Sequence, residues 1–296
     1  MRMEYLFVLI LAACNVGARR VVDLTHTFDK NAPKYPLEFL GYDSDKFTYF
    51  NMTILADQFI GDMWIGIRQV EFYEHQGTHI DAPNHFGSGR QAMDEIPPER
   101  LIGEGVVLDV RDKVKQNPDY AVSLQDIKDH ESTYGKIPPG AIVCMNSGWA
   151  DKYPDPVLVF GSNDLKNVST FHFPGFSLDA CKMLLNERQV GVVGVDTPSI
   201  DPGQADGYYC HMYLQPNQVP LLEYVANLDS VPARGTTMVL GAMKMRDGTG
   251  GPTRVFAFMD DKDDDETNTA NMYRSGVLST VCSLMIASYI TSFMHI

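Results

Sequence analysis

The chain has 296 residues, a formal net charge of −14 and an isoelectric point near 4.9. This acidic balance excludes nucleic-acid binding as a main role, because contact with phosphates needs clustered Lys and Arg. Roughly 250 residues remain once both ends of the chain are set aside, which suits one domain with a sizeable core.

The first 18 residues have the layout of a secretory signal peptide. Arg2 precedes an apolar run over residues 6–13, and residues 16–18, V-G-A, offer small side chains for cleavage. The apolar run is shorter than the roughly 20 residues that span a bilayer, which disfavours a transmembrane anchor. We therefore expect a mature chain that starts at Arg19.

Apolar and polar residues alternate in three segments before the first motif, and this predicts strands over residues 21–28, 48–54 and 64–73. Trp64 is expected in the core. Residues 31–47 are rich in Pro, Tyr and acidic side chains without a clear period, which predicts a loop. Its aromatic residues are expected to pack on the surface rather than to shape a substrate entrance: Tyr35, Phe39 and Tyr42.

Residues 75–86 form the motif that the function depends on, H-Q-G-T-H-I-D-A-P-N-H-F. Gly, Pro and β-branched residues within it disfavour a helix. In an extended chain, side chains at alternate positions share one face, and the ionisable ones all fall at odd numbers: His75, His79, Asp81 and His85.

A straight strand cannot bring these side chains to one ion. At about 3.3 Å per residue, His75 and His79 would lie roughly 13 Å apart, too far for both imidazoles to bind one metal at about 2.1 Å. The chain is therefore expected to bend at or near Gly77. His75, His79 and Asp81 then form a set suited to Zn²⁺ or Mn²⁺ with a position open for water.

His85 remains for proton transfer. The alternative is that these are ordinary polar residues of an edge strand or loop. A packed group of ionisable side chains beside Gly, Thr and Pro is more typical of a metal or catalytic site.

The second half of the chain alternates strands and helices. Strands are expected over residues 105–110, 141–145 and 190–195, and helices over residues 123–130 and 177–187. Ser123 and Ser177 are the expected N-caps, with Asp126 at the third position of the first helix. His130, near the end of that helix, is expected on the surface. The pattern predicts a mixed α/β domain over residues 19–258.

The C-terminal segments resemble a processed tail. Residues 259–276 form an acidic and polar spacer, expected to be solvated, and residues 277–296 contain no charged side chain of Asp, Glu, Lys or Arg. This is the layout of a glycosylphosphatidylinositol attachment signal, and a retained transmembrane helix is the alternative. We favour the lipid anchor, and hence a cell-surface or extracellular location.

Two sequons for N-glycosylation, at Asn51 and Asn167, agree with a secreted route. Removal of both ends would leave Cys144, Cys181 and Cys210. Three cysteines allow at most one disulfide and one free thiol, so the fold is not a disulfide scaffold.

The motif at residues 75–86 resembles the signature of the cyclase family, H-x-G-T-H-x-D-x-P-x-H-F, at every specified position. That family contains bacterial-type kynurenine formamidase and isatin hydrolase. Three further segments look like family segments: N-S-G-W at 146–149, F-P-G-F-S at 173–177 and G-V-D-T-P-S-I-D-P at 194–202. The resemblance implies a single-domain swivelling β/β/α fold over residues 21–258 and a homo-oligomer.

The resemblance also implies further ligands. In formamidase-type members, Asp81 would bridge two ions, with His75 and His79 on the first and His211 and Glu223 on the second. Isatin-hydrolase-type members look mononuclear and draw a Gln from the same region, for which Gln215 and Gln218 are available. The sequence leaves one ion and two ions open, and the presence of both His211 and Glu223 favours two.

The expected chemistry is hydrolysis. A divalent ion lowers the pKa of bound water from about 15.7 to near 7. Asp81 would orient that water, and His85, with an ordinary pKa near 6.5, would pass the proton to a departing nitrogen. The resemblance names the small-molecule amide substrates as N-formylkynurenine or a lactam such as isatin. The alternative is an inactive, surface-tethered family member that binds a ligand. No spacing argument selects Arg68, Arg100 or Arg234 as a partner for a product carboxylate.

Overall fold

The computed structural model describes residues 19–47 and 49–260. The predicted signal peptide, most of the acidic spacer and the apolar tail at residues 277–296 lie outside the described residues. Val21–Met259 forms one compact unit. Within the described part of the chain, none of the helices has the length and apolar character needed to cross a membrane.

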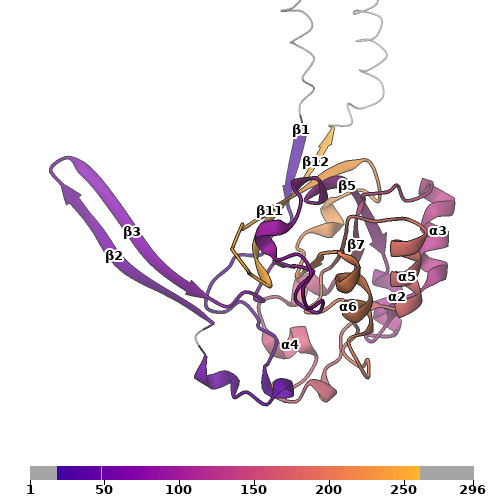
Figure 1. Cartoon of the computed structure of the whole chain (residues 1–296), viewed down its shortest axis with the longest axis horizontal. Helices are drawn as coiled ribbons and strands as arrows, with labels where there is room; N and C mark the ends of the chain where they lie inside the picture. Colours follow the sequence, from indigo (N-terminus) through magenta and orange to yellow (C-terminus); the bar gives the residue numbers. More distant parts are fainter. Residues whose placement is uncertain (1–18, 48, 261–296) are drawn as a thin grey trace, which may run out of the picture. The chain divides into compact units, whose positions relative to one another are not determined.

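An eight-stranded mixed sheet forms the centre of this unit (Figure 1). Its strands lie in the order β1-β12-β11-β5-β7-β9-β10-β4, and β12 also pairs with β4. The last pairing joins the two sides of the sheet, so the strands close into a barrel. Their bounds are β1 Arg19–Asp23, β4 His79–Asp81, β5 Ile102–Asp109, β7 Ile142–Asn146, β9 Val192–Val195, β10 Leu221–Glu223, β11 Thr236–Ala242 and β12 Gly250–Asp260.

The parallel strands β5, β7 and β9 are apolar on both faces because both faces are covered. Val106 packs outward into one hydrophobic cluster, with side chains of α3, α5 and α6. Its neighbour Val107 packs inward into a second cluster, with Leu222, Leu240 and Val255. The strand alternation thus divides the core into a helix-covered layer and a barrel interior.

In the part of the chain that the structure describes, five α-helices accompany the sheet: α2 Arg111–Gln116, α3 Leu124–Tyr134, α4 Pro156–Phe160, α5 Leu178–Asn186 and α6 Tyr209–Leu214. In Figure 1, α2, α3, α5 and α6 gather on one side of β5 and β7. The predicted caps are confirmed, because Ser123 accepts from the amide of Asp126 and Ser177 from that of Ala180. His130 was expected on the surface, which is wrong: it is 9% exposed, since its turn of α3 faces the core.

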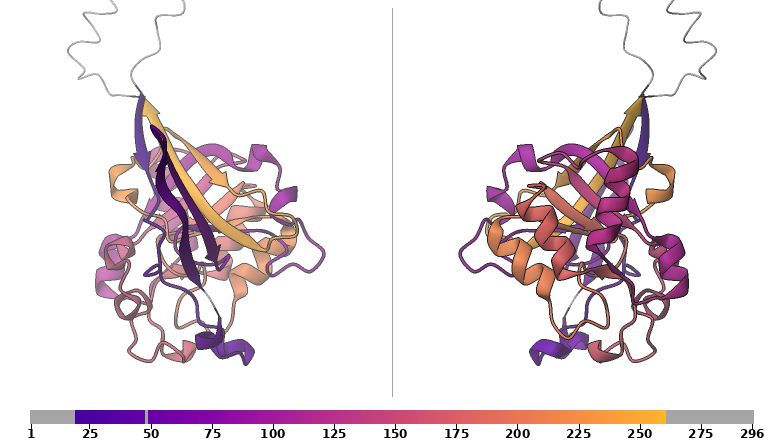
Figure 2. Two further views of the ribbon diagram at one scale, coloured as in Figure 1. Left: turned by 90° about the vertical axis from the view of Figure 1, so that its left-hand side faces the viewer. Right: turned by 90° about the vertical axis from the view of Figure 1, so that its right-hand side faces the viewer.

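The strands β2 Phe50–Ile60 and β3 Met63–Phe72 form a long antiparallel hairpin that projects away from the barrel (Figure 1, Figure 2). Both strands were predicted, but β2 runs six residues beyond its expected end at Ile54. The core position expected for Trp64 is wrong, because this side chain lies on the hairpin and is 54% exposed. An aromatic residue in a strand does not reveal whether that strand is covered.

Several other predictions differ from the observed structure. The strand expected over residues 21–28 ends at Asp23, and Thr25 makes only an isolated bridge to Val225. The strands β11 and β12, with the short β6 Ala121–Val122 and β8 Gly175–Phe176, were not predicted. Cys144, Cys181 and Cys210 are free and buried, so none of the cysteines of the described residues forms a bridge.

A buried ion pair ties α3 to the segment after α5. Arg188 Nε lies 2.5 Å from Glu131 Oε1, and Arg188 Nη2 lies 2.8 Å from Glu131 Oε2. The amide of Ile137 donates to the same Glu131 carboxylate. Removing one partner of such a pair leaves a nearly buried charge without compensation.

We expect Arg188→Ala to lower the free energy of unfolding by about 3 kcal/mol. The matched control is Lys182→Ala on α5, whose ammonium group makes only a surface pair with Asp179, and we expect a change of about 0.5 kcal/mol or less. Denaturant titration followed by tryptophan fluorescence measures both. Equal, small losses in the two variants would contradict a stabilising role for the Arg188 pair.

Candidate metal centre

The three-residue strand β4 lies between β10 and β12, and this position organises the site. Ile80 points into the barrel interior and is fully buried. The alternation then turns His79 and Asp81 to the opposite face. Glu223 is the direct cross-strand partner of His79 on β10, so its side chain lies on that same face.

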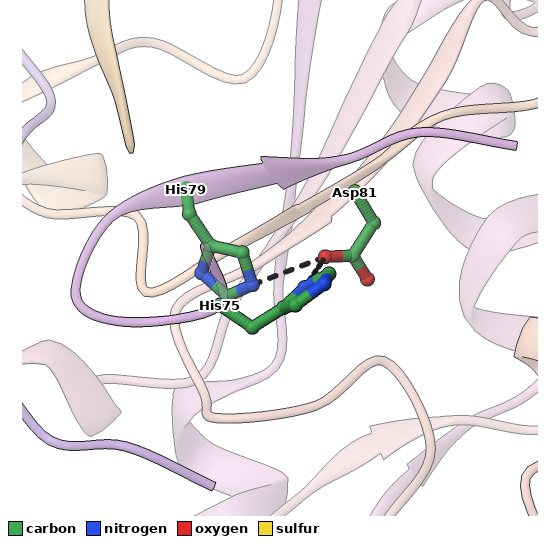
Figure 3. A group of neighbouring side chains, drawn as sticks. All are labelled: His75, His79 and Asp81. Atoms are coloured by element: carbon green, nitrogen blue, oxygen red, sulfur yellow. Dashed lines mark hydrogen bonds and ion pairs between the residues drawn. The ribbon is translucent and has the colours of Figure 1, made fainter. Parts of the chain in front are cut away.

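The bend predicted at Gly77 is confirmed. Gly77 has φ +58°, a left-handed conformation that favours glycine, and a Cβ there would come within 3.0 Å of the Phe28 ring. The bend returns His75 toward β4, where its Nδ1 lies 2.7 Å from Asp81 Oδ1 (Figure 3). On the other side of the same carboxylate oxygen, His79 Nε2 lies at 3.1 Å.

Thr249 and Glu74 determine which ring nitrogen of His75 carries the proton. The hydroxyl of Thr249 donates to Glu74 Oε2 at 2.6 Å, because a carboxylate can only accept. The Thr249 oxygen is then left to accept from His75 Nε2 at 3.0 Å. A neutral imidazole protonated at Nε2 carries its lone pair on Nδ1, the atom that faces Asp81.

The same arrangement recurs at the other two imidazoles. His79 Nδ1 lies 2.9 Å from the carbonyl oxygen of Gly77, and His211 Nδ1 lies 2.7 Å from Asp201 Oδ2. Both acceptors place the ring proton on Nδ1 and the lone pair on Nε2. Asp201 also accepts the amides of Cys210 and His211, which holds the first turn of α6 in place.

The three lone pairs converge on two carboxylates. His211 Nε2 lies 3.5 Å from Asp81 Oδ2 and 3.4 Å from Glu223 Oε1, and His79 Nε2 lies 3.5 Å from Glu223 Oε2. Two groups of possible ligand atoms share Asp81, namely His75, His79 and Asp81, and Asp81, His85 and His211. Asp81 therefore stands between a first and a second set of nitrogen ligands.

The electrostatics of this group favour a cation. Burial raises the pKa of Asp81, but the surrounding imidazoles of His75, His85 and His211 outweigh this effect, so that this pKa lies well below its usual value. Burial, and then the negative charge of Asp81, raise the pKa of Glu223. A divalent cation relieves this repulsion between two buried carboxylates.

The residues present fit such a cation. His79 is 1% exposed, and its Nε2 has no hydrogen-bond partner among the described residues although it points at Asp81. Nitrogen and carboxylate donors without thiolates suit Zn²⁺ or Mn²⁺. The structure thus brings together all five predicted ligands: His75, His79, Asp81, His211 and Glu223.

His85 lies beside these ligands, with a ring nitrogen within 4.8 Å of ligand atoms of Asp81 and His211. Its ring stacks on that of His75 with centroids 4.0 Å apart, and it lies 6.1 Å from the ring of His211. Burial, followed by the electrostatic effect of the neighbouring His75, lowers the pKa of His85 to about 3. The imidazole is therefore neutral near pH 7 and has a nitrogen lone pair available.

The site forms the floor of a cavity of about 300 Å³. Aromatic and aliphatic side chains make its walls: Tyr35, Leu37, Phe39, Leu40, Tyr73, Phe86, Tyr208 and Tyr224. The expectation that Tyr35 and Phe39 pack only on the surface is wrong, because the loop that carries them folds over the site. Tyr35 contacts Phe160 and Phe171 of the core on its other side.

The glutamines and arginines considered as further ligands or carboxylate partners do not line the cavity. Gln215 Oε1 accepts the amide of Phe86 and Gln218 Oε1 that of Gln91, and neither side chain lines the cavity. The three arginines are also engaged outside it: Arg68 with Asp57, Arg100 with the Gln218 carbonyl, and Arg234 with Glu104. The glutamines therefore position neighbouring backbone.

Sequence reasoning missed the residues that orient the ligands, Glu74, Thr249 and Asp201. Asp201 lies within the segment 194–202 that was singled out, and its spacing of ten residues from His211 was the available signal. Thr249 is 174 residues from His75, and only the pairing of β12 with β4 brings it near.

We expect Thr249→Val to weaken binding of Mn²⁺ or Zn²⁺ by about 10- to 100-fold, because His75 loses the acceptor that sets its tautomer. Calorimetric titration of the metal-stripped protein measures this. Thr253→Val, on the strand β12 that follows Thr249, is the matched control, since the Thr253 hydroxyl is buried without a partner among the described residues. Wild-type affinity in Thr249→Val would contradict the orienting role.

Comparison with known proteins gives a consistent picture. An isatin hydrolase from Roseibium aggregatum is 29% identical over 249 residues, which cover 81% of this chain and 86% of the relative. A kynurenine formamidase from Salinibacter ruber is 24% identical over 194 residues, covering 64% of this chain and 79% of the relative. The solved structure of isatin hydrolase A from Ralstonia solanacearum superposes with a TM-score of 0.73 at 28% identity, covering 88% of this chain and 98% of that one.

The fold expected from the motif is therefore that of its structural neighbours, a mixed α/β domain. A family model described as "Putative cyclase" matches residues 22–202, more than half of the chain. The chain belongs to the cyclase family.

Proposed function

We propose that the chain is a metal-dependent hydrolase that cleaves the carbon–nitrogen bond of a small aromatic amide, with an isatin-like lactam as the leading substrate. One observation carries the proposal: three imidazole lone pairs and two carboxylates converge at the floor of a cavity with aromatic walls. The 29% identity to an isatin hydrolase over 86% of its length supports the same reaction.

The ligands proposed are His75, His79 and Asp81 for one ion, and Asp81, His211 and Glu223 for a second. When bound, a divalent cation such as Zn²⁺ or Mn²⁺ polarises a carbonyl and makes water acidic enough to react near neutral pH. Each imidazole ligand is held by a partner outside the site, Thr249, Gly77 or Asp201, so the nitrogen donors are arranged before binding.

Proton transfer in the reaction is assigned to His85. Water adds to the amide carbonyl carbon, a carbon–oxygen bond forms, and the carbon–nitrogen bond breaks. His85, neutral near pH 7, accepts the proton that water releases and returns it to the departing nitrogen. The product is a carboxylate with a free amine. The aromatic walls exclude bulk water, which strengthens these electrostatic interactions.

The wall composition separates the two candidate substrate classes. The described residues that line the cavity include no Lys or Arg. A neutral bicyclic lactam needs no such partner, whereas the amino-acid carboxylate of N-formylkynurenine does. Retention of His211 and Glu223 beside Asp81 favours N-formylkynurenine as the second candidate, since the resemblance places a second ion there in formamidases.

The intact arrangement argues against an inactive ligand-binding member. A site that only binds a ligand does not need a proton carrier. Burial of His85 beside His75 lowers its pKa, which keeps its imidazole neutral for that role. The ligands also retain their outer hydrogen bonds, which a disused site need not keep.

We expect His79→Ala to lose bound metal and hydrolysis of isatin together, because it removes a buried ligand nitrogen. His85→Ala should keep the metal and lower kcat by about 10²- to 10⁴-fold, since it removes only the proton carrier. Elemental analysis and an absorbance assay measure the two effects. His172→Ala is the control, because His172 is exposed and pairs with Asp119 away from the cavity.

Wild-type turnover in His85→Ala would contradict the proton-carrier role. Parallel assays on isatin and N-formylkynurenine decide between the substrates. A metal-loaded wild type that hydrolyses neither would contradict the proposed reaction.

We further propose that the protein enters the secretory pathway and is tethered to the cell surface by a glycosylphosphatidylinositol anchor. Support comes from the sequence of residues 1–18 and 277–296 and from the exposure of both sequon asparagines, Asn51 and Asn167. Ser169 donates its hydroxyl to Asn167 Oδ1 at 2.7 Å, within an exposed turn.

We expect phosphatidylinositol-specific phospholipase C to release the protein from intact cells, and a glycosidase to lower its apparent mass. Immunoblots of medium and cells measure both. A variant that ends at residue 276 should appear in the medium without the enzyme. Retention of the wild type after phospholipase treatment, with release only by detergent, would indicate a transmembrane tail instead.

A further inference from the structure

One segment of the chain separates the substrate cavity from a second cavity. The side chains of residues 34–39, here called the partition, alternate between the two. Those at odd positions line the substrate cavity, and those at even positions line the second cavity: Tyr35, Leu37 and Phe39 on one side, and Lys34, Pro36 and Glu38 on the other. The second cavity measures about 850 Å³, which lies within the range of small-molecule sites.

Gln76 joins the start of the partition to the metal-binding motif. Its Nε2 donates to the carbonyl oxygen of Ala32 at 2.8 Å, and Lys34 forms an isolated β-bridge with Gln76. The preceding residue, His75, lines the substrate cavity, whereas Gln76 lines the second one. The two cavities therefore lie on opposite sides of the same backbone, and the second is separate from the metal centre.

Gln76 brings an unsatisfied acceptor to the second cavity. The side chain is 1% exposed, and its Oε1 has no hydrogen-bond partner among the described residues. A buried polar atom left without a partner costs about 1–3 kcal/mol. A ligand that donates an N–H or O–H group to this oxygen removes that cost.

Lys34 brings a cation without an anionic partner. The side chain is partly buried, its Nζ lies 3.2 Å from the centroid of the Tyr49 ring, and it forms no ion pair with the other described residues. Burial lowers the pKa of Lys34, against the opposing charges of Asp45 and Glu38. An anion in the cavity would supply the missing counter-charge.

The acidic side chains that line the same cavity already have partners of their own. Glu38 accepts from a neighbouring hydroxyl and amide, and Asp155 accepts the first amides of α4. Asp45 Oδ2 lies 2.6 Å from Lys166 Nζ. The charge left without a counter-ion is therefore that of Lys34, and the cavity favours an anion over a cation.

The remaining walls of the second cavity are apolar and stiff. They include four prolines, an aromatic ring and an aliphatic side chain: Pro33, Pro36, Pro154, Pro156, Phe160 and Leu165. Proline rings lose little conformational freedom when they are covered. Such walls suit a flat apolar body rather than a hydrated inorganic anion.

We propose that the second cavity is a binding site for a small aromatic carboxylate that carries an amine or hydroxyl group. The carboxylate accepts from the Lys34 ammonium group, the amine or hydroxyl donates to Gln76 Oε1, and the ring lies against the proline-rich walls. 2-Aminobenzoate has all three features and serves as the probe.

Equilibrium dialysis of the metal-loaded protein, as its expressing cells process it, measures binding of 2-aminobenzoate. We expect Lys34→Met to raise the dissociation constant at this site at least about 10-fold, because it keeps the apolar stem and removes a charge-assisted hydrogen bond. Lys34→Arg keeps the charge and should retain binding. Lys46→Met is the matched control, since Lys46 pairs with Asp43 on the surface and does not line the cavity.

Three further probes each lack one feature. Benzoate lacks the donor for Gln76, aniline lacks the anion, and glycine lacks the apolar body, so each should bind more weakly at this site. A carboxylate can also bind the metal centre, so His79→Ala, which we expect to lose the metal, separates the two sites. Binding that depends on Lys34 should persist in His79→Ala, whether or not the protein hydrolyses an amide.

Bound metal in Lys34→Met confirms that this variant has folded. Absence of binding by the wild type, or equal affinity in the wild type and Lys34→Met, would overturn the proposal. Equal affinity of the wild type for 2-aminobenzoate and aniline would also overturn it, because the site would then not select an anion.

Discussion

The buried carboxylate of Asp81 is the interaction on which the site depends. It is 1% exposed, and imidazoles approach it from β4, from the bend before β4 and from α6. A carboxylate so placed is tolerated only with compensating positive charge. The barrel supplies the geometry, because β4 is held by β10 on one side and by β12 on the other. Closure of the sheet at β4 therefore fixes the positions of His79 and Asp81.

The ligands are oriented by groups that do not touch the reacting atoms. Thr249 with Glu74, the carbonyl of Gly77, and Asp201 each hold the outer nitrogen of one imidazole. Each therefore directs a lone pair inward, which reduces the cost of ordering the site when a cation binds. Gly250 leaves room for the His75 ring because it has no side chain. A Cβ at this position would lie 2.6 Å from His75 Cε1.

The sequence was sufficient for the local part of this arrangement. The odd-numbered spacing from His75 to His85 and the glycine between the first two imidazoles predicted a bent segment with its ligands on one face, and Ser123 and Ser177 marked helix starts. Contacts between residues far apart in the sequence could not be predicted. Thr249 reaches His75 across 174 residues. Tyr35 and Phe39 were misplaced because an irregular loop has no period, and Trp64 because strand propensity does not report burial.

Anomalous X-ray diffraction from crystals grown with Mn²⁺ tests the central claim most directly. The account predicts a peak about 2.2 Å from His75 Nδ1, His79 Nε2 and an oxygen of Asp81. A second peak between Asp81, His211 and Glu223 would indicate two ions. Absence of any peak beside Asp81, with His75 and His79 still hydrogen-bonded to the protein alone, would contradict it.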